Sequence, residues 1–105
     1  MAKKYRVENR NEVDGYIIYI GNIEPISDRF QIRRLVIELE AEGYKQEVPF
    51  DFVNEKMRLA EGFAIGSHVH ITFALRGRSK ILGKGEMQGK KVWYPSLEVL
   101  NISRL

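Results

Sequence analysis

The sequence feature that most constrains the fold is a pair of alternating segments joined by three residues. Apolar and polar side chains alternate in residues 30–40 and again in residues 44–53. A period of two places successive side chains on opposite faces, as in a half-buried β-strand. Between the two segments, Gly43 tolerates a positive φ and predicts a tight hairpin turn. Pro49 has no N–H to donate, so the second strand is expected to be an edge or to bulge there.

The segment before this hairpin is apolar on both parities. Residues 13–23 carry apolar side chains at both even and odd positions and contain two glycines. Such a strand is either buried on both faces or exposes an aromatic face to a ligand. Residues 24–28 are expected to form a loop. Residues 1–12 are polar and lack a periodic pattern, which predicts a flexible arm ahead of a domain at residues 13–105.

A short helix and two more strands are expected after the hairpin. Asn54 is a candidate N-cap, and residues 55–61 are good helix formers that end before a glycine. Residues 69–75 again alternate. A Gly- and Lys-rich loop is expected at residues 79–90, before a last strand at residues 91–103. The apolar parity changes within that strand, which predicts a bulge.

The order of these elements predicts the fold class. Three strands, a helix and two further strands match an all-β, five-stranded OB-fold Greek-key barrel with one short helix between strands 3 and 4. An open β-sandwich and a small SH3-like barrel are the competing architectures, and the position of the helix favours the OB-fold. A chain of 105 residues has room for one hydrophobic core.

Composition and motifs exclude several function classes. The chain has no cysteine, so it has neither disulfides nor a thiolate metal site. No apolar run is long enough for a membrane helix, and the basic N-terminus lacks the apolar run of an export signal. Neither Ser27 nor Ser67 lies in a nucleophile motif, and the glycine-rich loop at residues 83–90 lacks the Ser/Thr and helix of a P-loop. We expect a cytoplasmic binding protein, without membrane association, that is not an enzyme and needs no cofactor.

Two histidines are candidate metal ligands. His68 and His70 are two residues apart on an expected strand, so their rings lie on one face. A zinc site takes three or four ligands, and the chain has no other histidine and no cysteine. An exposed polar strand face is the favoured interpretation, and no metal is expected.

Charge is distributed unevenly along the chain. The net charge is only +3, but residues 36–66 are rich in acids and residues 76–91 are rich in lysine and arginine. A basic region attracts polyanions whatever the global sum. A solvated basic loop is the plain alternative.

Several blocks of the sequence resemble a known family. These blocks are Arg33-Arg34-Leu35-Val36-Ile37-Glu38, Tyr44-Lys45-Gln46-Glu47-Val48-Pro49-Phe50, the segment at residues 66–78 that ends Arg76-Gly77-Arg78, and Trp93-Tyr94 followed by Leu97 and Ile102. They resemble the strands of small bacterial and phage OB-fold proteins related to single-stranded DNA-binding proteins. Gly66-Ser67 stands where that family usually has Gly-Asp, and the loop at residues 79–90 is longer than usual. The resemblance implies the OB-fold and single-strand binding, a role that belongs to DNA replication and repair.

Single-stranded nucleic acid is held by aromatic platforms for its bases and by cations along its phosphates. OB-folds place such groups on the face of strands 2 and 3 and in the loops between strands 1 and 2 and strands 4 and 5. The candidate binding residues are Arg33, Arg34, Tyr44, Lys45, Arg76, Arg78, Lys80, Lys84, Lys90, Lys91, Trp93 and Tyr94. They predict sequence-tolerant binding of single-stranded DNA, with RNA left open as a ligand. A protein–protein interaction module is the alternative function, and the two-sided apolar first strand predicts a homo-oligomer.

Overall fold

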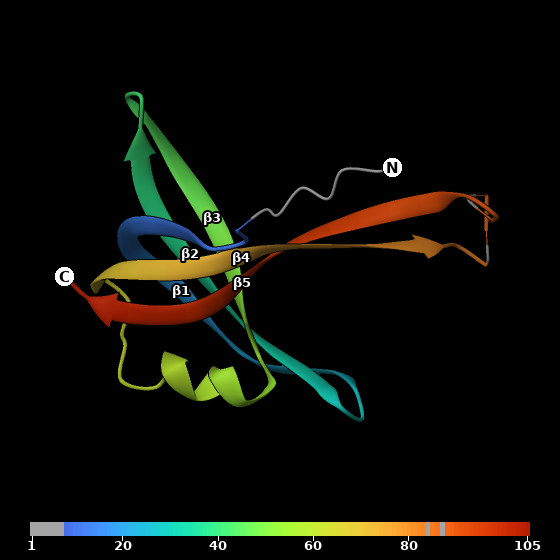
Figure 1. Cartoon of the computed structure of the whole chain (residues 1–105), viewed down its shortest axis with the longest axis horizontal. Coiled ribbons are helices and arrows are strands. Elements are labelled where there is room, and N and C mark those ends of the chain that lie inside the picture. Colours follow the sequence, from blue (N-terminus) through green and yellow to red (C-terminus); the bar gives the residue numbers. More distant parts are fainter. Residues whose placement is uncertain (1–7, 84, 87) are drawn as a thin grey trace, which may run out of the picture.

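The computed structural model describes residues 8–83, 85–86 and 88–105. In these residues the chain forms β1 (Asn11–Ser27), β2 (Phe30–Ala41), β3 (Tyr44–Val53), the 3-10 helix η1 (Asn54–Ala60), β4 (His68–Ile81) and β5 (Lys91–Arg104) (Figure 1). The strands close into a barrel in the order β1-β2-β3-β5-β4. Only the contact between β3 and β5 is parallel, and the other neighbours are antiparallel. This five-stranded barrel with a helix between β3 and β4 is the predicted OB-fold.

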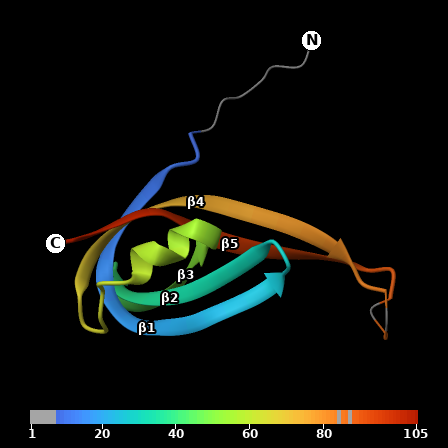
Figure 2. The same cartoon turned by 90° about the horizontal axis from the view of Figure 1, so that it is seen from below.

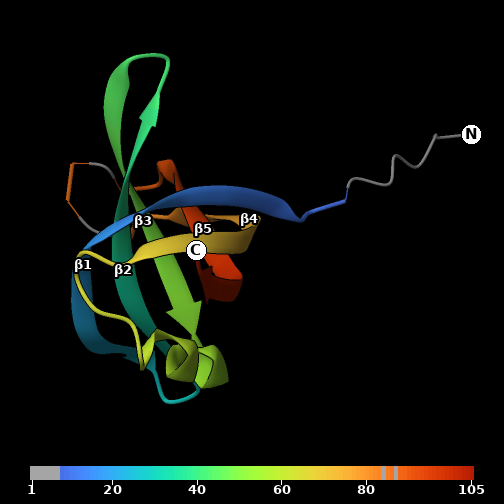
Figure 3. The same cartoon turned by 90° about the vertical axis from the view of Figure 1, so that its left-hand side faces the viewer.

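Alternation along the strands fills the barrel interior. The fully buried large side chains are Phe50, Phe52, Ile17, Leu35, Ile37, Ile71, Val69 and Val99. Each contributes about 1.5–3 kcal/mol relative to an exposed position. The helix η1 closes one end of the barrel, with Ala60 in the core and Met57 and Leu59 packed against it (Figures 2 and 3). No described helix is long and apolar enough to cross a membrane.

The β2–β3 and β4–β5 hairpins both extend away from the barrel. The β2–β3 hairpin ends in a turn at Glu42 and Gly43, whose φ angles are 55° and 82°. The β4–β5 hairpin forms a long two-stranded extension, at the right of Figure 1. We call residues 75–81 and 91–97 the ribbon. Along it β4 has no strand partner other than β5 among the described residues.

Irregularities in the strands match two of the predictions. In β5 the register shifts by one residue between the pairs Thr72↔Asn101 and Phe73↔Val99, so the predicted bulge is confirmed. Pro49 is paired with β2 in regular register, and the described contact of β3 with β5 is at Asp51. Pro49 therefore lies on an open edge of β3, where its missing N–H breaks no ladder.

Other local predictions were wrong. Residues 24–27 are not a loop but the end of β1, paired with β2 as far as Ser27. The ladder between β4 and β5 continues to Ile81, which shortens the expected loop at residues 79–90. Asn54 does not cap the helix: its φ is 51° and its Oδ1 accepts a hydrogen bond from the Gln31 backbone N–H at 2.9 Å. Pairing between β-strands decides these cases, and the sequence pattern of one strand does not reveal which residues pair.

Candidate nucleic-acid interface

A cleft of about 440 Å³ lies between the β1–β2 hairpin and the β4–β5 hairpin. Its lining residues come from β1, β2, β3, β4 and β5: Ile26, Phe30, Ile32, Arg34, Asp51, Val53, Arg76, Gly77, Arg78, Tyr94, Pro95, Ser96 and Glu98. This is the region in which OB-folds bind oligonucleotides. We refer to it as the cleft.

Strand parity explains what the cleft contains. On β2 the odd residues Leu35 and Ile37 point into the core, so the even residues Phe30, Ile32 and Arg34 lie on the outer face. The apolar members form one side of the cleft together with Ile26 of β1. They offer a surface against which the flat face of a base can pack.

The floor of the cleft is a carboxylate that holds two other side chains. Asp51 is 7% exposed. Its Oδ1 accepts from Arg34 Nε at 3.1 Å, and its Oδ2 accepts from Ser96 Oγ at 2.8 Å. The Arg34 side chain remains 52% exposed, so its guanidinium is fixed at one side and open to the cleft at the other.

The opposite side of the cleft is cationic and aromatic. Register pairs Arg76 with Ser96, Arg78 with Tyr94 and Lys80 with Val92, so the three cations lie on one face of the β4–β5 hairpin. Arg76 Nε donates to Glu98 Oε2 at 2.8 Å. The Arg78 guanidinium lies 5.7 Å from the centroid of the Tyr94 ring, within cation–π range. The cleft thus combines an aromatic ring with a row of cations.

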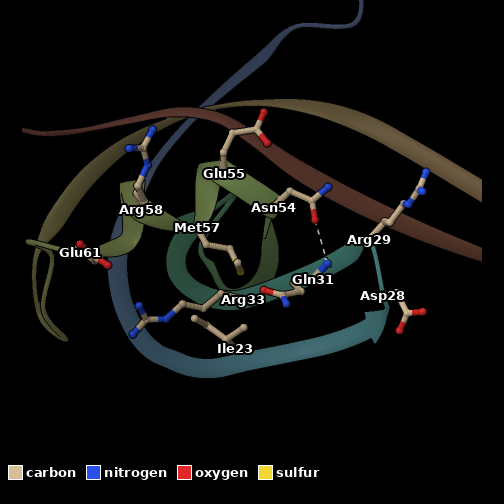
Figure 4. A pocket seen from close by; sticks show the side chains of 10 residues that line it. All are labelled: Ile23, Asp28, Arg29, Gln31, Arg33, Asn54, Glu55, Met57, Arg58 and Glu61. Carbon is tan, nitrogen blue, oxygen red and sulfur yellow. Dashed lines mark hydrogen bonds between the residues drawn. The ribbon is translucent and has the colours of Figure 1, made fainter.

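Arg33 does not lie beside Arg34. It belongs to the opposite face of β2, where its Nε donates to the Gly21 carbonyl at 2.9 Å. Figure 4 shows it in a second pocket of about 500 Å³, between the β1–β2 hairpin and η1. We call this the η1 pocket.

The η1 pocket is a weaker candidate for nucleic acid than the cleft. Its three arginines are Arg29, Arg33 and Arg58, and its three acids are Asp28, Glu55 and Glu61. Equal numbers of the two signs give no net attraction for a polyanion. Among the described residues no aromatic side chain lines it, so that part of the chain gives it no stacking platform.

Tyr44 and Lys45 lie at the far tip of the β2–β3 hairpin. Tyr44 is 71% exposed, and Lys45 Nζ lies 3.9 Å from Glu38 Oε1. Between this tip and the cleft, the register pairs Glu38 with Glu47 on the outer face. These carboxylates repel phosphates, so the structure separates this pair of predicted residues from the cleft.

The remaining predicted residues lie on or near the ribbon. Trp93 pairs with Ser79 and Lys91 pairs with Ile81, so both lie on the face opposite Tyr94. Lys91 Nζ is 5.7 Å from the centroid of the Trp93 ring. Lys90 lies in the loop between the two strands, and its carbonyl accepts from the Leu82 N–H. Lys84 lies outside the described residues.

Several cleft residues were not anticipated. Asp51, Ser96 and Glu98 position the arginines, and Ile26, Phe30 and Ile32 form the apolar side. One signal was available, because the parity that buries Leu35 places Phe30 and Ile32 on the same face as Arg34. The carboxylates that pair with the arginines lie on other strands. Only the register of the barrel shows which carboxylate faces which arginine.

The two histidines lie on the outer face of β4, away from the cleft. The His68 ring stacks on Tyr16 with a centroid distance of 4.2 Å. His70 Nδ1 lies 2.5 Å from Asp14 Oδ1, and Nε2 lies 3.3 Å from Glu12 Oε1. Hydrogen bonds to these two carboxylates raise the pKa of His70 above its usual 6.5. The carboxylates contact opposite ring nitrogens, and no group of three or more potential ligands among the described residues could hold a metal ion.

Fold and cleft together define an OB-fold protein with a cleft between its β1–β2 and β4–β5 hairpins. The sequence matches, over residues 12–103, the family model DUF3127, described as a domain of unknown function, and the chain belongs to this family. No curated protein matches the sequence.

Solved structures with the same fold support the assignment of the barrel. One is the mitochondrial single-stranded DNA binding protein Rim1 from S. cerevisiae, with a TM-score of 0.65 and 16% identity, covering 91% of this chain and 93% of that chain. Another is the dimeric structure of the N-terminal domain of PriB protein from Thermoanaerobacter tencongensis, with a TM-score of 0.62 and 17% identity, covering 92% of this chain and 96% of that chain. At these identities the likeness shows the fold.

Proposed function

We propose that the protein binds single-stranded DNA in the cleft, with little preference for base sequence. One observation carries the proposal: Arg76, Arg78 and Lys80 line one face of the β4–β5 hairpin beside Tyr94, opposite the apolar side of the cleft. Cations that follow the backbone and an aromatic ring that stacks on bases are what single-strand binding requires. Rim1, which has the same fold, is a single-stranded DNA binding protein.

The cleft also explains why binding would tolerate different sequences. Arginine side chains neutralise phosphates, which every nucleotide carries, and a ring stacks on any base. Such a protein acts wherever duplex DNA is opened in the cytoplasm, as in replication and repair. It holds its ligand without chemical change, so it needs no cofactor.

We also propose that the protein forms a homo-oligomer. The described surface exposes large apolar side chains beyond those of the cleft, among them Ile81 and Trp93. PriB, which has the same fold, is dimeric. Contiguous apolar surface of this kind is covered in most soluble proteins.

The test of DNA binding is a titration of a fluorescein-labelled oligo-dT followed by anisotropy, with two matched tyrosine variants. Tyr94→Ala removes a ring from the cleft and should lower affinity by about 1–3 kcal/mol, the contribution of one stacked base. Tyr44→Ala removes a ring from the distant hairpin tip and should leave affinity unchanged. Absence of binding by the wild-type protein at low salt would refute the proposal. Equal losses in the two variants would move the site away from the cleft.

A further inference from the structure

The ribbon has two chemically different faces. Arg76, Arg78 and Lys80 occupy the face toward the cleft. On the other face the register aligns Leu75 with Leu97, Gly77 with Pro95, Ser79 with Trp93 and Ile81 with Lys91. That face is apolar from Leu75 to Ile81 and carries a single charged residue, Lys91, at its outer end.

The apolar face is open to solvent. Leu75 is 57% exposed, Ile81 67% and Trp93 68%. At about 200 Å² for a fully exposed large side chain, these three leave about 400 Å² of apolar surface on one face. A patch of this size on a monomer is commonly an interaction site. An isolated two-stranded ribbon is also marginally stable in water, so it gains from a cover.

We infer that this apolar face docks against the same face of a second copy of the chain. The inference specifies the surface for the proposed homo-oligomer and is independent of DNA binding. A nucleic acid is the poorer occupant, because the cations that would meet its phosphates lie on the opposite face. A second copy presents the same apolar face, which matches the first in length and in apolar character.

Charge sets the orientation of the two copies. A parallel arrangement would bring the two Lys91 ammonium groups together, whereas an antiparallel two-fold arrangement places them at opposite ends. The cationic faces then point outward on the two sides of the dimer. Both clefts therefore remain accessible.

The outer face of β1 and its neighbours is a less suitable interface. Tyr16 is exposed there, but its ring already stacks on His68. Four carboxylates lie on or beside this face: Glu12, Asp14, Glu38 and Glu40. A two-fold contact through it would bring like charges together, which is unfavourable.

The area predicts a weak dimer. Two apolar faces of about 400 Å² bury about 800 Å² in total, the size of a weak or transient interface. We therefore expect a dissociation constant of at least about 1 μM. Association should be visible by sedimentation velocity between about 1 μM and about 500 μM.

Two isoleucines with the same exposure give a matched test. Ile81 lies on the apolar face and Ile65 lies in the segment before β4, and each is 67% exposed. Ile81→Ser should weaken self-association by at least about tenfold, because every dimer carries the change twice. Ile65→Ser should leave it unchanged. Neither change alters charge, so oligo-dT affinity at sub-micromolar protein should be unaffected in both.

Trp93 supplies a second readout, since it is the one tryptophan of the chain. Its emission should shift to shorter wavelength as the wild-type protein is concentrated, and the shift should disappear in Ile81→Ser. Undiminished association in Ile81→Ser would overturn the choice of face while leaving self-association standing. A wild-type monomer throughout the range would overturn both. Trp93 emission that responds to oligo-dT and not to protein concentration would assign this face to nucleic acid instead.

Discussion

The cationic row predicts how DNA affinity depends on salt. Arg78 and Lys80 are exposed on the cleft face, and neither belongs to an ion pair among the described residues. The double change Arg78→Gln and Lys80→Gln therefore removes two cations and leaves Asp51 and Glu98 with their partners. As a control, Arg29→Gln and Arg58→Gln removes two exposed cations from the η1 pocket. Both double variants lower the net charge of +3 by the same amount.

The magnitude follows from counterion release. On single strands each phosphate contact contributes about −0.7 to the slope of log K against log salt, so losing two contacts flattens the slope by about 1.4. This contribution vanishes at about 1 M salt. At about 50 mM salt the loss of two contacts should therefore lower affinity about 60-fold. The control variant should keep the wild-type slope, because the η1 pocket does not contact the DNA.

The assay is oligo-dT anisotropy at a series of salt concentrations, with thermal melting of each variant as a check of folding. An unchanged slope in the cleft variant would refute phosphate tracking along the β4–β5 hairpin. Equal flattening in both variants would show that affinity follows net charge and not the cleft.

Three further predictions concern stability. Asp51→Ala removes a buried carboxylate that accepts hydrogen bonds from Arg34 and Ser96, and should lower the free energy of unfolding by about 1–3 kcal/mol, as measured by denaturant titration. The pKa of His70 is raised in the folded state, so its stabilising contribution is present below about pH 6.5 and is lost as pH rises through the folded pKa. The melting temperature of His70→Gln should therefore fall below that of the wild type at pH 5.5 and approach it at about pH 9, and a pH-independent difference would contradict this. Gly15→Ala places a Cβ 2.9 Å from the Glu38 carbonyl oxygen and should destabilise the fold by about 1–3 kcal/mol. Gly77→Ala should not, because no atom of the described residues lies within 4 Å of its added Cβ.

Much of the fold follows from local pattern. The strands at residues 30–40 and 44–53, the turn at Gly43 and the bulge in the last strand are each specified by a few neighbouring side chains, and the structure contains all of them. The end of β1 was missed because Pro25 and its polar neighbours carry turn signals. The pairing of those residues with β2 outweighs that local preference.

The candidate site was predictable by residue type and less so by location. The basic segment and Tyr94 were found from composition, and the structure places Arg76, Arg78 and Tyr94 together in the cleft. Sequence neighbours such as Trp93 and Tyr94 were expected to act together, but a strand sends adjacent side chains to opposite faces. The start of the first strand could not be predicted from local pattern either. Asn11 and Glu12, expected in the arm, pair with β4.

Asn9 marks the place where the barrel stops supporting the wall of the cleft. Its side chain makes the two backbone hydrogen bonds that a neighbouring strand would make. Nδ2 donates to the Leu75 carbonyl at 2.8 Å, and Oδ1 accepts from the Leu75 N–H at 2.7 Å. Beyond this point β4 is bonded only to β5 among the described residues. The wall of the cleft that the β4–β5 hairpin forms is therefore compliant and can bend without opening the barrel. A compliant wall adapts to bases of different size at small energetic cost. Binding immobilises this wall, and the conformational entropy lost in doing so limits the affinity for any one sequence.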